Sequence, residues 1–317
     1  MDRIPISYLC GDIKSAVGKI KGSFTEIRLR REKPVIIMRN AKGFFLGKNG
    51  ELYSLLCGSC LYASGECFDR TFEAVCRYSI HSFQESICSG FITLDGGHRV
   101  GICGTAVMRS GNIINVKDIS GLNFRVAREM KGCSEKIYNK TFSSGLSNVL
   151  IAGAPASGKT TFLRDLARIL GSQYKTAVID ERGEIAAVCG GIPQNDVGAN
   201  TDIFNGYSKR DGIETAVRSM SPDIIICDEA GNDEDFSSFR YAMTCGVKIC
   251  ASIHASCMED ISAKKDFCGE FDYIVFLDKI PGNPFRIVKA VQYDKNGVHN
   301  FPNADCGPYG KLFCGQS

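Results

Sequence analysis

The sequence lacks any hydrophobic run of the roughly 18–20 residues that a membrane-spanning helix requires. Residues 1–22 carry scattered lysines and have no apolar stretch of the kind found in a secretory signal. Internal repeats and low-complexity segments are also missing. These absences predict a cytoplasmic protein that is not itself inserted in a membrane.

Histidine is scarce, and this limits the metal sites that the chain can build. Sixteen cysteines are present, but without a framework pattern, and in a chain with no secretory signal we expect them to stay reduced. Cys57 and Cys60 form one C-x-x-C pair, whereas a zinc site usually needs a second pair or suitably spaced histidines. Ordinary thiols are favoured, with a structural metal or a redox pair as the alternative. The four histidines are His81, His98, His254 and His299.

Length and composition predict a globular protein of two domains. The chain has 317 residues, about twice the ~150 of an average domain. Hydrophobic residues make up 44% and charged residues 23%, so a sizeable core can form. Residues 1–146 carry a net charge of +8 and the remainder −5, which together give the +3 of the whole chain. The basic half either binds an anionic partner or simply has a solvated basic surface.

The second half alternates short apolar runs with amphipathic segments. This alternation predicts a parallel sheet covered by helices on both faces. We expect an edge strand at 285–293 and an irregular tail after it. The expected buried strands are 148–153, 175–180, 223–228, 248–253 and 273–277, and the expected helices are 160–170, 212–220, 233–244 and 258–267.

The first half has a different pattern, which predicts a smaller α+β domain. Residues 26–39 alternate around Pro34 as two strands joined by a turn, and residues 68–79 have helical spacing. Residues 91–107 contain a Gly-Gly turn between apolar runs, which indicates a hairpin. We therefore expect an N-terminal domain over 1–145, an α/β domain over 146–293 and a tail over 294–317.

Residues 153–161 (GAPASGKTT) fit the phosphate-binding pattern G-x-x-x-x-G-K-[ST]. The motif follows an apolar strand and precedes a helix, as a phosphate cradle requires. We expect Lys159 to neutralise the β- and γ-phosphates and the Thr160 hydroxyl to ligate Mg²⁺. The predicted nucleotide-binding residues are Gly153, Ala154, Pro155, Ala156, Ser157, Gly158, Lys159, Thr160 and Thr161.

A second acidic motif favours hydrolysis over transfer to a small molecule. The apolar run 223–227 ends in Asp228 and Glu229. Asp228 is expected to hold Mg²⁺ through its water shell, and Glu229 to orient and deprotonate the attacking water. The alternative is a strand that ends in a solvated acidic turn.

Other polar groups follow neighbouring strands, and in a parallel sheet they would meet at one edge. Glu181 lies in the acidic segment 180–184, and His254 follows another strand, from which it would sense or hydrogen-bond the γ-phosphate. Arg218 precedes the strand of Asp228 and is a candidate for pairing with carboxylates or reaching phosphate. Ordinary strand-end or surface roles remain open for each. Arg99, Arg125 and Arg128 are candidates for reaching a nucleotide on a neighbouring subunit, with surface charge as the alternative.

Together these motifs resemble the secretion ATPase superfamily and, within it, the stage III sporulation protein AA family. The position before Thr201 departs from the family pattern, because Asn200 stands where a basic residue is expected. The segments that carry the resemblance are 153–161, 180–184, 193–198, 218–223, 228–229 and 254–255, with 26–30, 90–93 and 96–104 in the first half.

The resemblance implies a RecA-like ATPase core behind a smaller N-terminal domain, assembled as a hexameric ring. It implies ATP and Mg²⁺ as cofactors and a cytoplasmic ATPase in the mother cell that energises a membrane-embedded channel of a secretion-like complex. Segment 180–184 would be the acidic box of the family and His254 its histidine box. Nucleic acid is not expected as a partner.

Two other functions remain open from the residues alone. The basic first half is compatible with a nucleic-acid-associated P-loop ATPase, although its basic residues are dispersed. Every quoted motif is also compatible with a nucleotide-gated scaffold that binds ATP and scarcely hydrolyses it.

Overall fold

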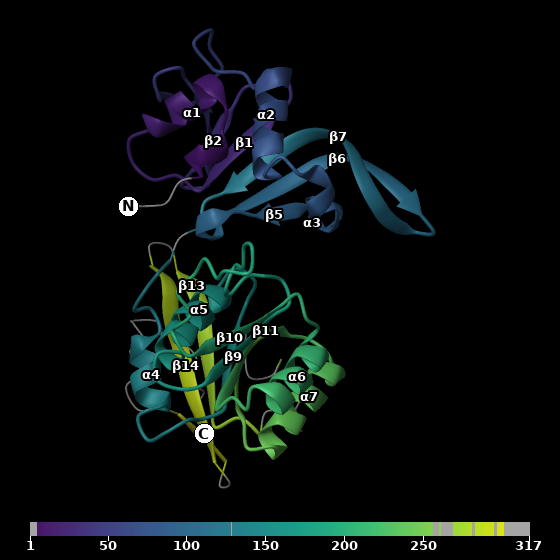
Figure 1. Ribbon diagram of the computed structural model, residues 1–317. Coiled ribbons are helices and arrows are strands. Elements are labelled where there is room, and N and C mark those ends of the chain that lie inside the picture. Colours follow the sequence, from purple (N-terminus) through teal and green to yellow (C-terminus); the bar gives the residue numbers. More distant parts are fainter. Residues whose placement is uncertain are drawn as a thin grey trace. The chain divides into compact units, whose positions relative to one another are not determined.

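The computed structural model describes residues 5–127, 129–255, 260, 269–280, 283–294 and 297–300, with side chains described up to residue 278 (Figure 1). The chain divides into two compact units. The first contains residues 1–128 together with 189–194, and the second contains 129–188 and 195–317. No helix in the described part of the chain is long and apolar enough to cross a membrane.

The first unit is an antiparallel sheet with three short α-helices, and its strand order is β4-β3-β2-β1-β7-β6-β5. Its strands are β1 (Glu26–Arg30), β2 (Ile36–Arg39), β3 (Lys42–Leu46), β4 (Leu52–Tyr53), β5 (Phe91–Thr93), β6 (Arg99–Arg109) and β7 (Asn112–Arg125). Its helices are α1 (Gly11–Gly18), α2 (Gly65–Val75) and α3 (Gln84–Cys88). The paired strands expected over 26–39, the helix near 68–79 and the hairpin over 91–107 are confirmed.

Alternating side chains explain why this sheet has a buried face. Ile27 and Leu29 of β1 are buried, whereas their neighbours Arg28 and Arg30 are exposed. Helix α2 begins after Ser64, whose side chain accepts a hydrogen bond from the Cys67 N–H, and it buries Phe68, Thr71, Phe72 and Val75. These apolar side chains form one continuous core in the first unit.

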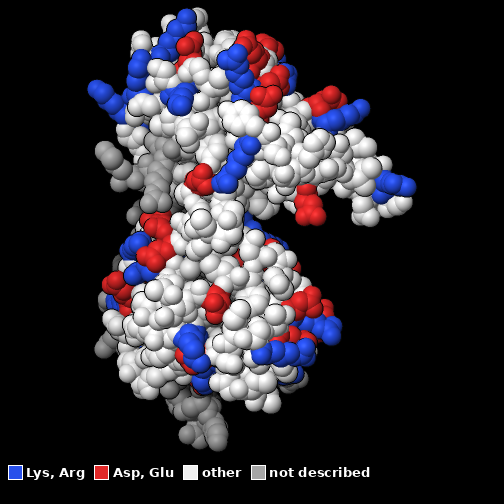
Figure 2. Space-filling model, in the orientation of Figure 1, with Lys and Arg blue, Asp and Glu red and all other residues white. Residues whose placement is uncertain are grey.

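The hairpin of β6 and β7 extends beyond this core. Residues 103–120 are mostly exposed in both strands, and the pair forms a long arm in Figure 1. The visible surface of the arm is mostly uncharged (Figure 2). The sequence did not indicate this length, because an arm with two solvated faces has no regular apolar pattern.

The second unit contains an eight-stranded sheet of order β10-β9-β11-β12-β8-β13-β14-β15. Its strands are β8 (Val149–Gly153), β9 (Thr176–Asp180), β10 (Thr201–Asn205), β11 (Ile224–Ala230), β12 (Lys248–His254), β13 (Tyr273–Ile280), β14 (Asn283–Asp294) and β15 (Gly297–Asn300). In this order, all neighbouring strands from β10 through β9, β11, β12 and β8 to β13 pair in parallel. Strands β14 and β15 extend the sheet by antiparallel pairing. All five residues of β8 and of β9 are buried, as expected for central strands.

Helices cover the parallel sheet with two apolar clusters. They are α4 (Glu135–Thr141), α5 (Lys159–Leu170), α6 (Lys209–Ser219) and α7 (Asp233–Thr244). Side chains of α4 and α5 belong to one cluster, and side chains of α6 and α7 to the other. The α/β fold with a parallel sheet and a preceding α+β unit is therefore confirmed.

In the second unit the structure corrects one expectation, adds a strand that was not predicted, and leaves another expectation untested. Residues 297–300 form β15, so the tail expected after 293 begins with an ordered strand, and β14 is not an edge strand. Strand β10 was missed because its sequence TDIFN is only partly buried at the opposite edge. The helix expected at 258–267 lies outside the described residues, apart from residue 260.

The division between the units also differs from the expected boundary after residue 145. Residues 129–145 belong to the second unit because Ile137 and Phe142 pack into the core beside α5. Residues 189–194 instead group with the first unit, where the Gly96 N–H donates to Gln194 Oε1 at 2.8 Å. Neither contact has a local sequence signal.

Asp165 on α5 anchors the chain that leads into α4, and this predicts a pH dependence of stability. Burial opposes ionisation of Asp165, but hydrogen bonds from the Ser134 N–H and hydroxyl, Arg168 and the Gly132 N–H outweigh it. They hold the pKa of this carboxyl below its ordinary value of 3.8. Its contribution to folding is therefore complete well above pH 3.8 and is lost as pH falls through the lower folded pKa.

We expect Asp165→Asn to flatten the acid limb of a plot of unfolding free energy against pH, measured by urea denaturation. The reason is that the amide has no proton to gain. Asp202→Asn, at an exposed position of β10, is the matched control and should keep the wild-type slope. Identical slopes in wild type and Asp165→Asn would show that this anchor does not titrate on unfolding.

Candidate nucleotide site

The site lies where four neighbouring parallel strands end. Strands β9, β11, β12 and β8 are adjacent in the sheet, and their carboxyl ends carry Asp180, Glu229, His254 and Gly153. Ligands of open parallel sheets bind at this edge, because the loops and helix N-termini that follow the strands converge there. The four sequence segments expected to meet are therefore on one edge.

The loop between β8 and α5 has the backbone that a phosphate cradle needs. Gly158 has φ 97° and Ala156 has φ 62°, both in the left-handed region. Gly153 has no space for a side chain, since a Cβ there would contact Ser157 Oγ and the Leu277 carbonyl. No side chain caps the N-terminus of α5, which begins at Lys159. Its first N–H groups and the helix dipole are therefore oriented to bind an anion.

Lys159 lies inside this loop with 5% of its surface exposed. Its ammonium group donates to the carbonyl oxygens of Gly153 at 2.9 Å and Ala154 at 3.0 Å, and to His254 Nδ1 at 3.1 Å. Burial lowers the pKa of Lys159, although the nearby carboxylates of Asp228 and Glu229 oppose this shift. Lys159 is thus a desolvated cation with weak acceptors, ready to exchange them for phosphate oxygens.

The end of β11 carries the carboxylates of Asp228 and Glu229 on an irregular stretch of the strand. The pairing of β11 with β12 shifts register between Cys227 and Ala230, and Glu229 has a left-handed φ of 46°. The Ser252 hydroxyl of β12 donates to Asp228 Oδ1, and the Glu229 N–H donates to both Ser252 Oγ and Asp228 Oδ1 at 2.9 Å. Strained backbone held by side-chain hydrogen bonds is common at functional sites.

Asp228 Oδ2 gives the clearest sign of a missing ligand. It is buried and has no hydrogen-bond partner within the described part of the chain, and the same holds for Ser157 Oγ of the loop. A buried carboxylate oxygen without a donor is costly unless a cation or water binds it. Carboxylate and hydroxyl oxygens are ligands that Mg²⁺ accepts, so this donor set fits the ion.

His254 connects the loop to Glu229. An ammonium group can only donate, so Nδ1 of His254 accepts from Lys159 and Nε2 carries the proton. Nε2 then donates to Glu229 Oε1 at 3.2 Å, and Arg182 forms an ion pair with Glu229 Oε2. Lys159, His254, Glu229 and Arg182 thereby form one continuous polar chain across the strand ends.

Asp180 and Glu181, at the end of β9, do not join this chain. Asp180 is 1% exposed, and its carboxylate accepts the N–H groups of Glu184, Ile185 and Ala186. Glu181 forms an ion pair with Lys209 of α6 at 2.6 Å. Asp180 therefore stabilises the backbone of the acidic segment. Within the described contacts, Glu181 does not bind Lys159 or Asp228.

We expect Asp180→Ala to lower the free energy of unfolding by about 2–4 kcal/mol, because two buried N–H groups and the partly buried N–H of Glu184 lose their acceptor. Chemical denaturation measures the change. Asp202→Ala on the neighbouring β10 removes an exposed carboxylate and should change stability by less than about 0.5 kcal/mol. Equal effects of the two substitutions would refute the structural role of Asp180.

Two further positions lie away from this edge. Arg218 is near the C-terminus of α6, before β11 begins, and pairs with Glu214 at 3.4 Å. Asn200 joins the start of β9, because its carbonyl accepts the Thr176 N–H. Both positions belong to the opposite edge of the sheet, so the structure does not bring either residue to the P-loop of the same chain. Of the three N-terminal arginines, Arg99 stacks on Phe91, Arg125 is exposed at the end of β7, and Arg128 lies outside the described residues.

Sequence reasoning missed two side chains of the site. Ser252 lies two residues before His254 in β12, and the two-residue period of a strand places both on one face, which could have identified it. Arg182 was noted only as part of the acidic segment, and its partner Glu229 is 47 residues away. That pairing has no local signal.

The structure resembles known motors in its fold. It matches the pilus retraction motor PilT with bound ADP at a TM-score of 0.57 and 14% identity, over 95% of this chain and 85% of that one. It matches the Legionella pneumophila ATPase DotB at a TM-score of 0.53 and 15% identity, over 86% and 78%. The chain therefore has the RecA-like α/β fold of these two ATPases, with a P-loop sequence after β8.

The family follows from the sequence comparisons. The family model "Sporulation stage III, protein AA" matches residues 9–299. The chain is 32% identical over 285 residues to "Stage III sporulation protein AA" of Bacillus subtilis (strain 168), covering 86% of this chain and 87% of that protein. The chain belongs to this family. A shorter match, 28% identical over 147 residues, is to "Protein SEEDLING PLASTID DEVELOPMENT 1" of Arabidopsis thaliana, covering 45% of this chain and 21% of that protein.

Proposed function

We propose that this chain hydrolyses ATP with Mg²⁺ as an oligomeric secretion-type ATPase and energises a sporulation-associated complex across the cell envelope. The observation that carries the proposal is the polar chain from Lys159 through His254 to Glu229, next to an uncapped helix N-terminus. This combination supplies a phosphate site and a carboxylate base at one strand edge. Family membership supports the sporulation context.

Phosphate binding is assigned to the loop and α5. The N–H groups of residues 153–161 surround the phosphates, and Lys159 exchanges the carbonyl oxygens of Gly153 and Ala154 for phosphate oxygens. The Lys159–His254 contact then reports on phosphate binding, because the ammonium group moves when its acceptors change. This gives His254 the position of a phosphate sensor.

Thr160 and Asp228 are the residues that would hold Mg²⁺, and the unpartnered Asp228 Oδ2 supports this assignment. When bound, the ion neutralises negative charge on the β- and γ-phosphates. Ser252 orients Asp228 through the hydroxyl that it donates.

Glu229 is assigned as the base that orients and deprotonates the attacking water. Both of its carboxylate oxygens are engaged, one by His254 and one by Arg182. Each oxygen can accept a further hydrogen bond from water through its second lone pair, and Arg182 is the more exposed of the two partners, with 65% of its side chain accessible. Release of Arg182 from Glu229 would both free the base and provide a cation near the phosphates.

The working form is proposed to be a ring of six subunits that acts in the mother-cell cytoplasm on membrane-embedded channel components. Mass photometry of the full chain with and without ATP tests this assembly. We expect ATP with Mg²⁺ to shift the population from small species to one discrete oligomer, and Lys159→Ala to abolish the shift. A strictly monomeric protein under both conditions would contradict the motor.

Nucleic acid is not proposed as a partner. On the face shown in Figure 2, Lys and Arg are interspersed with Asp and Glu and do not form a continuous basic surface. A nucleotide-gated scaffold is the second candidate, because both oxygens of Glu229 are already engaged. Turnover measured against a Glu229 variant separates the scaffold from the motor.

A further inference from the structure

The C-x-x-C pair of the first unit forms a tight turn in the loop after β4. The Cys60 N–H donates to the Cys57 carbonyl at 3.1 Å, and the Cys57 N–H donates to Cys60 Sγ at 3.3 Å. The two sulfur atoms are 3.4 Å apart. The turn therefore already holds both thiols in contact.

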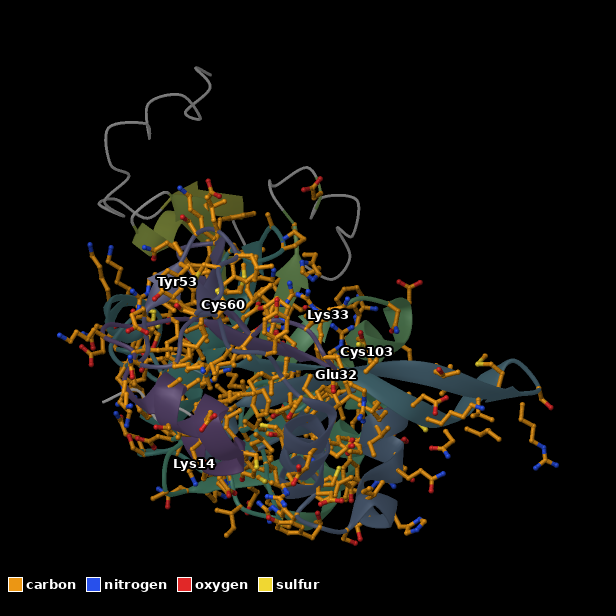
Figure 3. All side chains as sticks on the ribbon, turned by 90° about the horizontal axis from the view of Figure 1, so that it is seen from above. Lys14, Glu32, Lys33, Tyr53, Cys60 and Cys103 are labelled. Carbon is orange, nitrogen blue, oxygen red and sulfur yellow. The ribbon has the colours of Figure 1, made fainter. Side chains whose placement is uncertain are left out.

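The two cysteines differ in their attachment to the fold. Cys60 is 6% exposed and pairs with Gly47, and the next residue, Leu61, donates its N–H to the Leu46 carbonyl at 2.8 Å. Figure 3 shows Cys60 beside Tyr53 of β4. Cys57 is exposed, and it follows Leu55, which is 78% exposed. A bond between the sulfurs would tie an exposed apolar loop to a fixed part of the sheet.

A metal site explains this pair less well than a dithiol does. Stable zinc sites use four protein ligands, or three with an open position. Within the part of the chain that the structure describes, no group of three or more His, Cys, Asp or Glu is arranged to hold a metal. Two thiols in contact, one exposed and one buried, instead match the arrangement of an attacking and a resolving cysteine.

We propose that Cys57 and Cys60 form a reversible intramolecular disulfide by exchange with a low-molecular-weight disulfide. The Cys57 thiolate attacks one sulfur of that disulfide, which releases one small thiol and leaves a mixed disulfide on Cys57. Cys60 loses its proton to solvent and attacks the Cys57 sulfur, which releases the second small thiol and forms the Cys57–Cys60 bond. One small disulfide is reduced to two thiols, and two cysteines are oxidised.

The order of attack follows from exposure. Cys57 is reachable from solvent, whereas Cys60 is not. Burial raises the pKa of the Cys60 thiol, which lowers its thiolate fraction and further disfavours it as the first attacking group. An excess of small thiol reverses both steps.

Glutathione disulfide is the probe that tests this chemistry on the full chain. The protein is incubated with it, remaining thiols are alkylated, and peptides are analysed by mass spectrometry. In wild type we expect the 57–60 peptide to lose two hydrogen atoms and to carry no glutathione. In Cys60→Ser we expect glutathione to remain on Cys57, at an occupancy at least about tenfold higher than in wild type, because the fast intramolecular step is missing.

Cys103 is the matched control, because it is an exposed thiol of the same unit and lies apart from Cys60 in Figure 3. We expect Cys103 to keep its glutathione in both proteins. Cys57→Ser removes the attacking thiol at an exposed position, and Cys60 should then stay unmodified. A stable glutathione adduct on Cys57 in wild type, or two free thiols there while Cys103 reacts, would overturn the proposal. Full protection of the pair by equimolar zinc would also overturn it, in favour of a metal site.

Discussion

Glu229→Gln is expected to reduce steady-state phosphate release by between about 100-fold and 10,000-fold, the range that a general base contributes. The amide keeps the shape of the side chain, but its NH2 group cannot accept a hydrogen bond, so it retains the contact with only one of His254 and Arg182. It also cannot take a proton from water. ATP affinity should stay within about threefold of wild type, because Glu229 does not contribute to the phosphate cradle. Phosphate release from the purified full chain and a separate binding titration measure the two effects.

Glu214→Gln is the control for this substitution. Glu214 lies on α6, pairs with Arg218 and Arg210, and is remote from the strand ends that carry the site. Its variant should release phosphate at the wild-type rate. Similar rates for Glu229→Gln and wild type would remove Glu229 from the proposed role, and a barely measurable wild-type rate with intact binding would favour the scaffold.

Lys159→Ala is expected to weaken ATP binding by more than about 100-fold. A charge-assisted contact with phosphate in a desolvated site is worth about 3 kcal/mol, and each 1.4 kcal/mol changes affinity about tenfold. The fold should survive, because the ammonium group that is removed is held only by two loop carbonyls and His254. Binding of a fluorescent ATP analogue, with circular dichroism as a check on folding, measures the outcome.

Lys175→Ala removes a lysine at the opposite edge of the same sheet. Lys175 precedes β9 and pairs with Asp223, and its side chain is 64% exposed. This variant should bind ATP like wild type, which separates the local contact from a general loss of positive charge. Equal affinities for Lys159→Ala and wild type would contradict the phosphate cradle.

The central sheet and the phosphate loop were predictable because both depend on local sequence. Continuous apolar runs such as 149–153 can be satisfied only by burial on both faces, and Gly158 permits the left-handed backbone that the cradle uses at that position. The alternation of strands and helices implies a parallel sheet, and the carboxyl ends of its strands bring Asp228, Glu229 and His254 to one edge. These features depend on residues that are close together in the sequence, so a short segment is enough to predict them.

Long-range contacts account for what the sequence did not predict. Arg182, which follows β9, forms an ion pair with Glu229 of the neighbouring strand β11. Glu181 pairs with Lys209 of α6 and does not join the polar chain. Arg218 resembles a phosphate ligand by its sequence position, yet the direction of α6 places it at the far edge. The boundary between the units lies before residue 129 and not after 145, because Ile137 and Phe142 pack beside α5. Such pairings depend on tertiary structure, which local sequence patterns do not reveal.

Calorimetric titration of the unmodified full chain with ATP, in Mg²⁺ and then in excess chelator, is the most direct measurement. The site described above predicts saturable binding of one nucleotide per chain in Mg²⁺, and an affinity at least about tenfold weaker when the ion is removed, since the Asp228 carboxylate then faces the phosphates without a bridging cation. Absence of saturable binding, or an affinity that does not respond to the ion, would contradict it.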